Sequence, residues 1–320
     1  MKIIITGPTG MIGMALISKC IQEQIQVLAI CHRGSSGMRH IPQSRLVKVM
    51  EADLSEISQL SRLIDDKYDV FYHLAWAGTT GKARNDMYLQ NENIKFTLDA
   101  VELASQLGCR VFIGAGSQAE YGRYEGRLTP DTPVFPENGY GMAKLCAGQM
   151  SRIQCQELGI RHVWVRILSI YGPYGKADMI SQTIQKMLAG QKAEFTPGEQ
   201  IWDYLYSGDA ARALLLLGEK GKSGKVYVLG SGEARKLREY IEVMAKGAAD
   251  FTGKAPEVAL GAVSYGENQV MYLSAEIEEL CRDTGFAPEV SFESGIRETI
   301  CAMQNTGKYG KYKNIMQKFK

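Results

Sequence analysis

The sequence has almost no net charge, few histidines and no long apolar run, and each shortage excludes a class of protein. The 37 Lys and Arg residues nearly balance the 35 Asp and Glu residues, and a net charge of +2 argues against a nucleic-acid partner or an anionic membrane surface. The densest apolar run, 213–217, is far shorter than the roughly 18 residues of a spanning helix. Four histidines without ligand spacing predict no metal site.

Paired cysteines of the metal-binding or redox type are also missing. Seven cysteines, an odd number, are scattered along the chain without a CxxC motif, which indicates reduced and mostly buried thiols. Gly7 and Pro8 interrupt the first apolar stretch, so the N-terminus does not have the pattern of a secretory signal. We therefore expect a cytoplasmic protein without a membrane segment.

The first thirteen residues carry the most informative pattern. An apolar run of strand type, 3–5, leads to Gly7, Gly10 and Gly13, and an amphipathic segment, 11–25, follows. A strand that passes through such a turn into a helix directs backbone N–H groups and the helix dipole at one place, which suits a pyrophosphate. Gly7 would permit the tight turn, Gly10 the approach of phosphate, and Gly13 the packing of helix on strand. An ordinary strand-to-helix turn is the alternative.

Strand and helix patterns alternate along the first part of the chain. Strand-type runs occur at 3–6, 27–31, 46–50, 70–74, 110–113, 162–167 and 226–229. Helical periodicity occurs at 11–24, 55–65, 85–107 and 139–157. Repeated β-α-β units predict an α/β fold with a Rossmann-type, doubly wound parallel sheet.

Beyond Tyr171 this rhythm breaks, and glycine and proline punctuate shorter elements. We expect an NAD(P)-binding Rossmann domain at 1–170 and a smaller C-terminal substrate-binding lobe, mainly 171–320. The strand near 225–230 is expected to return to the main sheet, so the two parts interleave. The basic tail, 308–320, is expected to be a solvated terminal segment.

A second group of residues points to proton transfer. Tyr140 and Lys144 are four positions apart in a predicted helix, so they lie on one face, one turn apart. Ionising a tyrosine at neutral pH costs about 4 kcal/mol, and one cation roughly 4 Å away offsets about that much. Ser117 follows the 110–113 strand at the carboxyl edge of the sheet, where ligands bind. We expect Ser117, Tyr140 and Lys144 to meet there with the glycine turn.

The end of the second strand bears on the choice of cofactor. A site for NAD places a carboxylate there, on the ribose 2′-OH, and the segment 29–36 contains none. Arg33, with Ser35 and Ser36, suits a 2′-phosphate through charge-assisted hydrogen bonds. We therefore expect NADP(H) in preference to NAD(H).

The motifs described above make the chain resemble the extended short-chain dehydrogenase/reductase (SDR) superfamily along nearly its whole length. Within this superfamily, the chain resembles the NAD(P)-dependent nucleotide-sugar epimerases, reductases and dehydratases. The matching segments are 6–13, 53–54, 73–75, Asn93 with Thr97, Ser117, Tyr140 with Lys144, 166–173, 285–288 and 295–296. The resemblance implies cofactor contacts from Gly7, Thr9, Gly10, Met11, Ile12, Gly13, Asp53, Leu54, Leu74, Ala75, Tyr140 and Lys144, in addition to Arg33. It implies substrate contacts from Ser117, Gln118 and Ser169.

Two departures from the family pattern concern the substrate diphosphate. Ser169 stands in place of the usual Asn after the sixth strand. Trp202 stands where the family has an Arg near the substrate phosphates, and we expect Arg235 or Lys236 to take over that role.

A third departure concerns the reaction. In the 4,6-dehydratases of the family, the catalytic hydroxyl precedes an Asp-Glu pair, whereas Gln118 and Ala119 follow Ser117 here. Without that pair no acid–base group is present to remove the C5 proton and expel the C6 hydroxyl, so a dehydratase is disfavoured.

The resemblance therefore implies hydride transfer at C4 of a nucleotide-linked sugar, with a 4-keto sugar reductase as the leading hypothesis and a 4-epimerase as the alternative. Tyr140 would exchange a proton with the sugar oxygen, Lys144 would hold the nicotinamide ribose, and Ser117 would orient the reacting oxygen. A non-catalytic NADP(H)-binding regulator is the alternative of another class. Loss of the Tyr or the Lys would mark it, and both are present.

Three residues near these motifs have a structural alternative to a functional role. His73 closes a buried strand, where a hydrogen-bonded core histidine is the alternative to a catalytic one. Asp53 is followed by a segment for which it is a suitable helix N-cap. Glu120 is either an acid–base group or a residue with a surface or capping role.

The helices predicted at 85–107 and 139–157 bear on assembly, because their apolar positions extend around more than one side. These positions are Met87, Ile94, Leu98, Val101 and Leu103 in the first helix and Met142, Leu145, Met150 and Ile153 in the second. They either all pack inward or, as the family resemblance favours, form a homodimer through a four-helix bundle. Gly148 would then allow close approach of helices at the seam.

Overall fold

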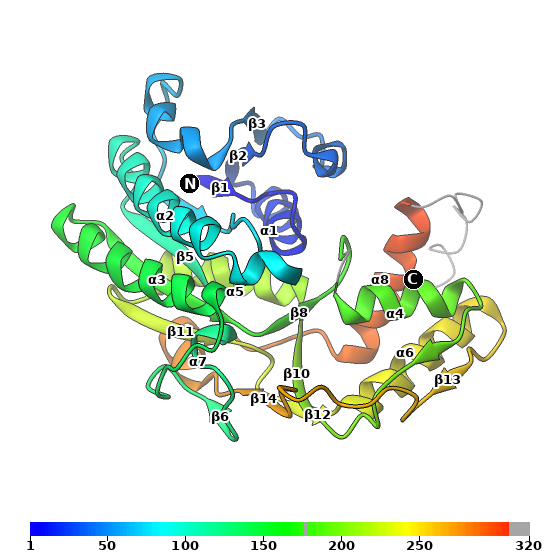
Figure 1. Cartoon of the computed structure of the whole chain (residues 1–320). Helices are drawn as coiled ribbons and strands as arrows, with labels where there is room; N and C mark the ends of the chain where they lie inside the picture. The colour runs from blue at the N-terminus through cyan, green and yellow to red at the C-terminus, as the bar shows by residue number, and fades with distance from the viewer. Residues whose placement is uncertain (176–177, 307–320) are drawn as a thin grey trace.

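A seven-stranded parallel sheet forms the centre of the computed structural model, which describes residues 1–175 and 178–306 (Figure 1). The strand order is β11-β7-β5-β4-β1-β2-β3, so the chain winds outward from β1 in both directions and the predicted Rossmann-type α/β fold is confirmed. These strands are Lys2–Thr6 (β1), Gln26–Cys31 (β2), Val47–Glu51 (β3), Val70–His73 (β4), Val111–Ser117 (β5), Arg161–Ile167 (β7) and Lys225–Leu229 (β11).

Helices cover both faces of this sheet, and each face has its own core (Figure 1). The helices of one face are α1 (Met11–Gln22), α5 (Ser207–Lys220) and α7 (Glu278–Thr284). Those of the other are α2 (Met87–Gln106), α3 (Gly139–Glu157) and the 3₁₀ helix η2 (Leu54–Arg62). Successive side chains of a strand point to opposite faces of the sheet. Ile3 and Ile5 of β1 therefore belong to the first core, and Ile4 belongs to the second.

A second, smaller sheet and its helices form a lobe beside the main sheet (Figure 1). Its strands are β6 (Arg127–Leu128), β8 (Ser169–Tyr171), β10 (Ile201–Tyr206), β12 (Ala234–Lys236) and β14 (Tyr272–Ala275). The remaining elements here are α4 (Met179–Leu188), α6 (Leu237–Thr252), α8 (Phe292–Thr306), β9 (Ala193–Glu194) and β13 (Val258–Ala259). Buried aromatic rings, including Tyr171, Tyr206, Tyr240 and Phe292, fill the core of the lobe.

The chain crosses between the two sheets more than once. β6 comes from the first half of the chain but pairs with β14 of the lobe, and β11 returns to the main sheet beside β7. A division at residue 170 therefore stays a prediction, and the expectation for the 308–320 tail lies outside the described residues. Within those residues, no helix has the length and apolarity needed to cross a membrane.

The helical segments predicted at 11–24, 85–107 and 139–157 match α1, α2 and α3 closely, and the helical segment predicted at 55–65 forms the 3₁₀ helix η2. Its apolar residues Leu54, Ile57 and Leu60 recur every three positions and face the core together. A spacing of three places side chains on one face of a 3₁₀ helix, which has about three residues per turn. Other 3₁₀ helices in the part of the chain that the structure describes are η1 (Ser36–His40), η3 (Gly81–Asn85) and η4 (Gln118–Glu120).

Candidate active site

The glycine-rich turn between β1 and α1 has the geometry that its three glycines predict. Gly7 has a left-handed backbone (φ +70°), and a Cβ there would lie 2.8 Å from the Ala75 nitrogen. A Cβ on Gly13 would collide with the Gly7 carbonyl oxygen, so this glycine lets α1 pack on the turn. A Cβ on Gly10 would meet only the Gly7 oxygen, at 3.5 Å, which leaves its outer side open to a phosphate.

The other residues predicted to hold the cofactor lie around this turn. The backbone N–H of Leu74 donates to the Thr6 carbonyl (3.2 Å), and that of Ala75 donates to the Thr6 hydroxyl (3.4 Å). The Ser35 hydroxyl donates to Thr9 Oγ1 (3.3 Å), which ties the loop after β2 to the turn. Met11 and Ile12 begin α1, and Ile12 packs on the core.

The predicted catalytic residues come together at the carboxyl end of β5. Ser117 is the last residue of β5, and its side chain is hydrogen-bonded to the Tyr140 phenol. Tyr140 lies in the first turn of α3, and Lys144 follows one turn later. The Lys144 Nζ donates to the carbonyl oxygen of Ala115 in β5 (2.6 Å) and lies 5.8 Å from the Tyr140 ring centroid.

Local features of the sequence bring the start of α3 to this strand. Asn138 caps the helix by accepting a hydrogen bond from the Gly141 N–H (2.9 Å). A Cβ on Gly141 would collide with the Ala119 carbonyl, so this glycine permits α3 to begin against η4. The first turn of α3, with Tyr140, is thereby held beside the end of β5.

Burial changes the proton affinities of the pair. Lys144 is only 3% exposed, and burial lowers its pKa to about 7, against an opposing effect of the nearby Glu120 carboxylate. Burial is also the largest effect on Tyr140 and raises its pKa, although the Ser117 hydrogen bond and the Arg84 charge act in the opposite direction. The spacing of Tyr140 and Lys144 therefore predicted that the two residues form a pair. It did not predict that burial raises the pKa of the Tyr140 phenol.

Two residues of the loop after β4 join the site without having been predicted. The Arg84 guanidinium lies over the Tyr140 ring, 4.3 Å from its centroid. The Trp76 indole meets the same ring edge-on at 6.1 Å, and the Lys144 Nζ lies 3.7 Å from the Trp76 ring centroid. Trp76 is held by a hydrogen bond to Gln90 of α2 (2.8 Å). Trp76 lies in a loop and Arg84 lies in the short 3₁₀ helix η3, and no motif of the sequence indicated either residue.

His73 behaves as a buried core residue in the described structure. Its Nδ1 is 3.0 Å from the Thr6 hydroxyl, and its Nε2 is 3.4 Å from the Thr97 hydroxyl. Burial, with a contribution from the Lys144 charge, lowers its pKa to about 3, so the ring is neutral at physiological pH. Nearby, the Asn93 amide binds both the N–H and the carbonyl of Ala77, each at 2.9 Å, and fixes the start of the loop.

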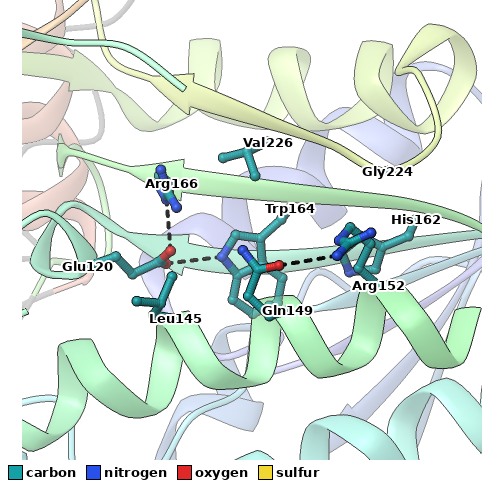
Figure 2. A pocket seen from close by; sticks show the side chains of 10 residues that line it. Glu120, Leu145, Gln149, Arg152, His162, Trp164, Arg166, Gly224 and Val226 are labelled. Atoms are coloured by element: carbon teal, nitrogen blue, oxygen red, sulfur yellow. Dashed lines mark hydrogen bonds and ion pairs between the residues drawn. The ribbon is translucent and has the colours of Figure 1, made fainter. Parts of the chain in front are cut away.

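Glu120 is a fully buried carboxylate with three hydrogen-bond donors around it, of which Figure 2 shows Trp164 and Arg166. It accepts hydrogen bonds from the Ser117 backbone N–H (2.8 Å), the Trp164 indole N–H (3.0 Å) and Arg166 Nε (2.8 Å). A cavity of about 120 Å³ opens beside this group, between α3 and the β7 and β11 strands (Figure 2). The arrangement favours the capping alternative for Glu120 over an acid–base role, because the carboxylate forms a capping box with Ser117 and its hydrogen bonds are to the surrounding protein.

Gly148 faces the same buried indole. A Cβ on Gly148 would lie 2.6 Å from the Trp164 ring, so this glycine lets α3 pack on β7 of its own subunit. The expectation that Gly148 marks a seam between subunits is therefore wrong.

The surroundings of Arg33 differ from the expectation of a free cation for a 2′-phosphate. Its guanidinium binds both oxygens of Glu56, at 2.9 and 3.1 Å. Its backbone N–H donates to Asp53 (3.2 Å), and the N–H of Gly34 donates to Glu51 (3.1 Å). The inference that no carboxylate lies at this edge is wrong, because β3 and η2 bring three carboxylates to the end of β2.

Asp53 and Leu54, predicted to contact the adenine, begin η2. Asp53 forms a capping box with Glu56, as the alternative interpretation has it, and the Asp53 backbone N–H donates to the Glu56 carboxylate (2.9 Å). The Leu54 side chain is partly buried and packs on the core beneath α2.

Ser169 and Trp202, the two residues of the lobe that depart from the family pattern, contact each other. The indole N–H of Trp202 donates to the Ser169 hydroxyl at 2.8 Å. The two cations expected to replace the missing Arg are each paired with a carboxylate, Arg235 with Glu293 and Lys236 with Glu199, both at 2.9 Å. Gln118 is half-buried at the start of η4. Among the described residues, no group of His, Cys, Asp and Glu side chains is placed to hold a metal ion.

A sequence model of the NAD dependent epimerase/dehydratase family matches residues 3–230. The chain belongs to this family. It is 25% identical to a putative UDP-glucose 4-epimerase of Methanocaldococcus jannaschii over 96% of this chain and 99% of that protein. It is 22% identical to a dTDP-glucose 4,6-dehydratase of Mycobacterium tuberculosis over 94% of this chain and 92% of that protein.

Solved structures of UDP-glucose 4-epimerases have the same fold as this chain. The UDP-glucose 4-epimerase of Thermotoga maritima, solved with UDP-glucose, superposes with a TM-score of 0.83 at 23% identity, over 96% of this chain and 99% of that one. The Thermus thermophilus UDP-glucose 4-epimerase, solved with NAD, gives 0.82 at 22% identity, over 96% and 100%. At these identities the likeness establishes the fold. The predicted family is confirmed, and the chain is an enzyme of the NAD-dependent epimerase/dehydratase type.

Proposed function

We propose that this enzyme is a nucleotide-sugar 4-epimerase. The observation that carries the proposal is the meeting of Ser117, Tyr140 and Lys144 at the end of β5, with the glycine turn at the same edge of the sheet. The 4-epimerase names of several relatives support this reaction over the 4-keto sugar reductase, which is the second candidate. The absence of an acidic pair after Ser117 argues against a dehydratase.

In this proposal each residue has a distinct task at the sugar C4 position. The glycine turn and Lys144 would hold NAD, which would supply the acceptor for the C4 hydride and its donor to the opposite face of the sugar. Tyr140 takes the proton of the C4 hydroxyl and later gives it back, and Ser117 donates a hydrogen bond to the same oxygen. Lys144, buried beside them, holds the cofactor ribose. The second lobe, with Ser169 and Trp202, contributes to the binding of the nucleotide sugar.

An assay without added reductant separates the two reactions. We expect the purified enzyme, supplied with NAD and with UDP-glucose or UDP-N-acetylglucosamine, to form the C4 epimer until equilibrium is reached, with no net change in NADH. Separation of the epimers by chromatography and the absorbance of NADH provide the measurement. Stoichiometric consumption of NAD(P)H with a 4-keto sugar, and no interconversion of epimers, would show a reductase instead.

We further propose NAD(H) as the cofactor, in place of the NADP(H) expected from the sequence. The bidentate pairing of Arg33 with Glu56 withdraws the cation from a 2′-phosphate, and Glu51 and Asp53 add negative charge beside it.

The pairing makes a testable prediction about specificity. Glu56→Gln frees the Arg33 guanidinium, and we expect NADP(H) affinity to rise on the order of tenfold, the effect of one charge-assisted hydrogen bond. Fluorescence titration of both cofactors measures this, with Glu125→Gln, a distant exposed carboxylate, as the control. Tighter binding of NADPH than of NADH by the unaltered enzyme would overturn the proposal.

A homodimer through α2 and α3 is the proposed assembly. Val101 and Leu103 are buried within the subunit, but four apolar side chains of these helices are 45–55% exposed: Met87, Met142, Met150 and Ile153. Three of them, on α3, share one face of the helix with Cys146.

We expect sedimentation at micromolar concentration to show twice the monomer mass. Met150→Glu should shift the protein to monomer, because it places a charge in an apolar contact. Leu63→Glu, which alters a residue 67% exposed at the end of η2, is the matched control and should leave the mass unchanged. A monomer for the unaltered chain contradicts the proposal.

A further inference from the structure

The Tyr140 phenol has a second cation beside it, supplied by the loop after β4. We propose that Arg84 is a positioning residue of the active site, which holds the Tyr140 ring and supplies the permanent positive charge that favours its phenolate. The proposal rests on the proposed function, because it assigns Arg84 a part in the proton transfer by Tyr140.

The geometry fixes Arg84 against the catalytic ring. Its guanidinium carbon lies 4.3 Å from the ring centroid, and Nη1 donates to the Thr79 carbonyl at 2.9 Å. The neighbouring Asn85 side chain accepts a hydrogen bond from the Gly139 N–H at 2.9 Å, at the start of α3. The η3 segment and the first turn of α3 are thus joined at two places, which holds the cation over the face of the ring.

The charges that face Tyr140 come from three elements. Arg84 lies on η3, Lys144 on α3 and Glu120 on η4, while Ser117 of β5 provides a hydrogen bond. The Lys144 Nζ is 5.8 Å from the ring centroid, farther than Arg84, and donates to a backbone carbonyl instead. Glu120 is negative and acts against the phenolate.

The two cations also differ in how firmly they keep their charge. Burial lowers the pKa of Lys144 to about 7, which brings the loss of its charge into the physiological range. A guanidinium stays protonated throughout the physiological range. Arg84, the nearer of the two cations, is therefore the one that keeps its charge at every working pH, and its removal raises the pKa of Tyr140.

The sign of the effect on catalysis follows from the role of Tyr140 as a base. A base acts when it is deprotonated, so a higher pKa moves the acid limb of the activity profile to higher pH. For Arg84→Met we expect this limb to move up by about one pH unit, and kcat at pH 7 to fall about tenfold. Arg84→Lys keeps a cation and should recover most of the loss. The KM for the nucleotide sugar and the affinity for NAD should not change.

Lys82→Met is the matched control, since Lys82 is an exposed cation on the same short helix. We expect it to leave the pH profile unaltered. An unchanged acid limb in Arg84→Met would overturn the proposal, as would a higher KM with the limb unmoved, which would make Arg84 a substrate-binding residue.

A direct titration keeps the test independent of the reaction. NMR of isotope-labelled tyrosine, with Tyr140→Phe identifying the signal, reports the ionisation of this phenol in the folded protein. We expect Arg84→Met to raise the pKa of that signal, and an equal pKa in both proteins refutes the proposal. If no nucleotide sugar is epimerised by the unaltered enzyme, the proposed function fails, while this titration still decides the role of Arg84. Should Arg84→Met not fold, Arg84→Gln serves the same titration.

Discussion

Tyr140→Phe is expected to lower the turnover of the nucleotide sugar about 100-fold or more, while NAD binding stays within a factor of two. The substitution removes only the hydroxyl that exchanges a proton with the sugar oxygen. The ring stays, and with it the contacts to Arg84 and Trp76. Turnover under saturating substrate and fluorescence titration of NAD measure the two quantities.

Tyr124→Phe is the control for this experiment. Tyr124 is 41% exposed in the loop after η4 and lies outside the proposed site, so its loss of a hydroxyl should leave turnover unchanged. Full activity in Tyr140→Phe would remove the phenol from the proton transfer, and the proposed mechanism with it.

The residues that sequence analysis placed correctly share one property, which is that their geometry is local. The glycine turn is set by the strand before it and the helix after it, and Tyr140 and Lys144 are spaced by a single helical turn. Parallel strands then bring their carboxyl ends to one edge, so the position of Ser117 beside them followed from the order of elements.

Errors arose where the neighbours come from other parts of the chain. The segment after β2 contains no carboxylate of its own, yet its pairing with β3 places Glu51 on the Gly34 N–H. Gly148 was expected to lie where helices of two subunits meet, but the ring that fills the space beside it, Trp164, belongs to β7 of the same chain. In both cases the sheet, and not the local pattern, decides what a residue touches.

The direction in which the pKa of Tyr140 is shifted could not be predicted from the sequence either. Spacing indicates that a cation lies one turn away, but the pKa of the phenol depends first on burial, which raises it. Arg84, the nearer cation, comes from the short 3₁₀ helix η3, far from Tyr140 in the sequence. The charges around a catalytic residue come from side chains of several elements, so the spacing of residues within one helix does not predict them.

The buried ion pair of Glu120 and Arg166 is expected to carry the largest effect on stability. Their side chains are 1% and 4% exposed, and Nε of Arg166 lies 2.8 Å from the carboxylate. Glu120→Gln keeps an acceptor for the Ser117 N–H and the Trp164 indole but leaves the Arg166 charge buried without its partner. We expect the free energy of unfolding to fall by about 3–5 kcal/mol, measured by urea denaturation.

An exposed pair and a double substitution control this prediction. Glu137→Gln breaks the ion pair with Arg123, whose side chains are 37% and 45% exposed, and should cost less than about 1 kcal/mol. Replacing Glu120 and Arg166 together by Leu removes both charges, so it should recover much of the stability lost in Glu120→Gln. If Glu120→Gln lowers the free energy of unfolding no more than Glu137→Gln does, the ion pair of Glu120 and Arg166 is not what holds η4 in place. Ser117 would then owe its position beside Tyr140 to the close contact of η4 with the first turn of α3.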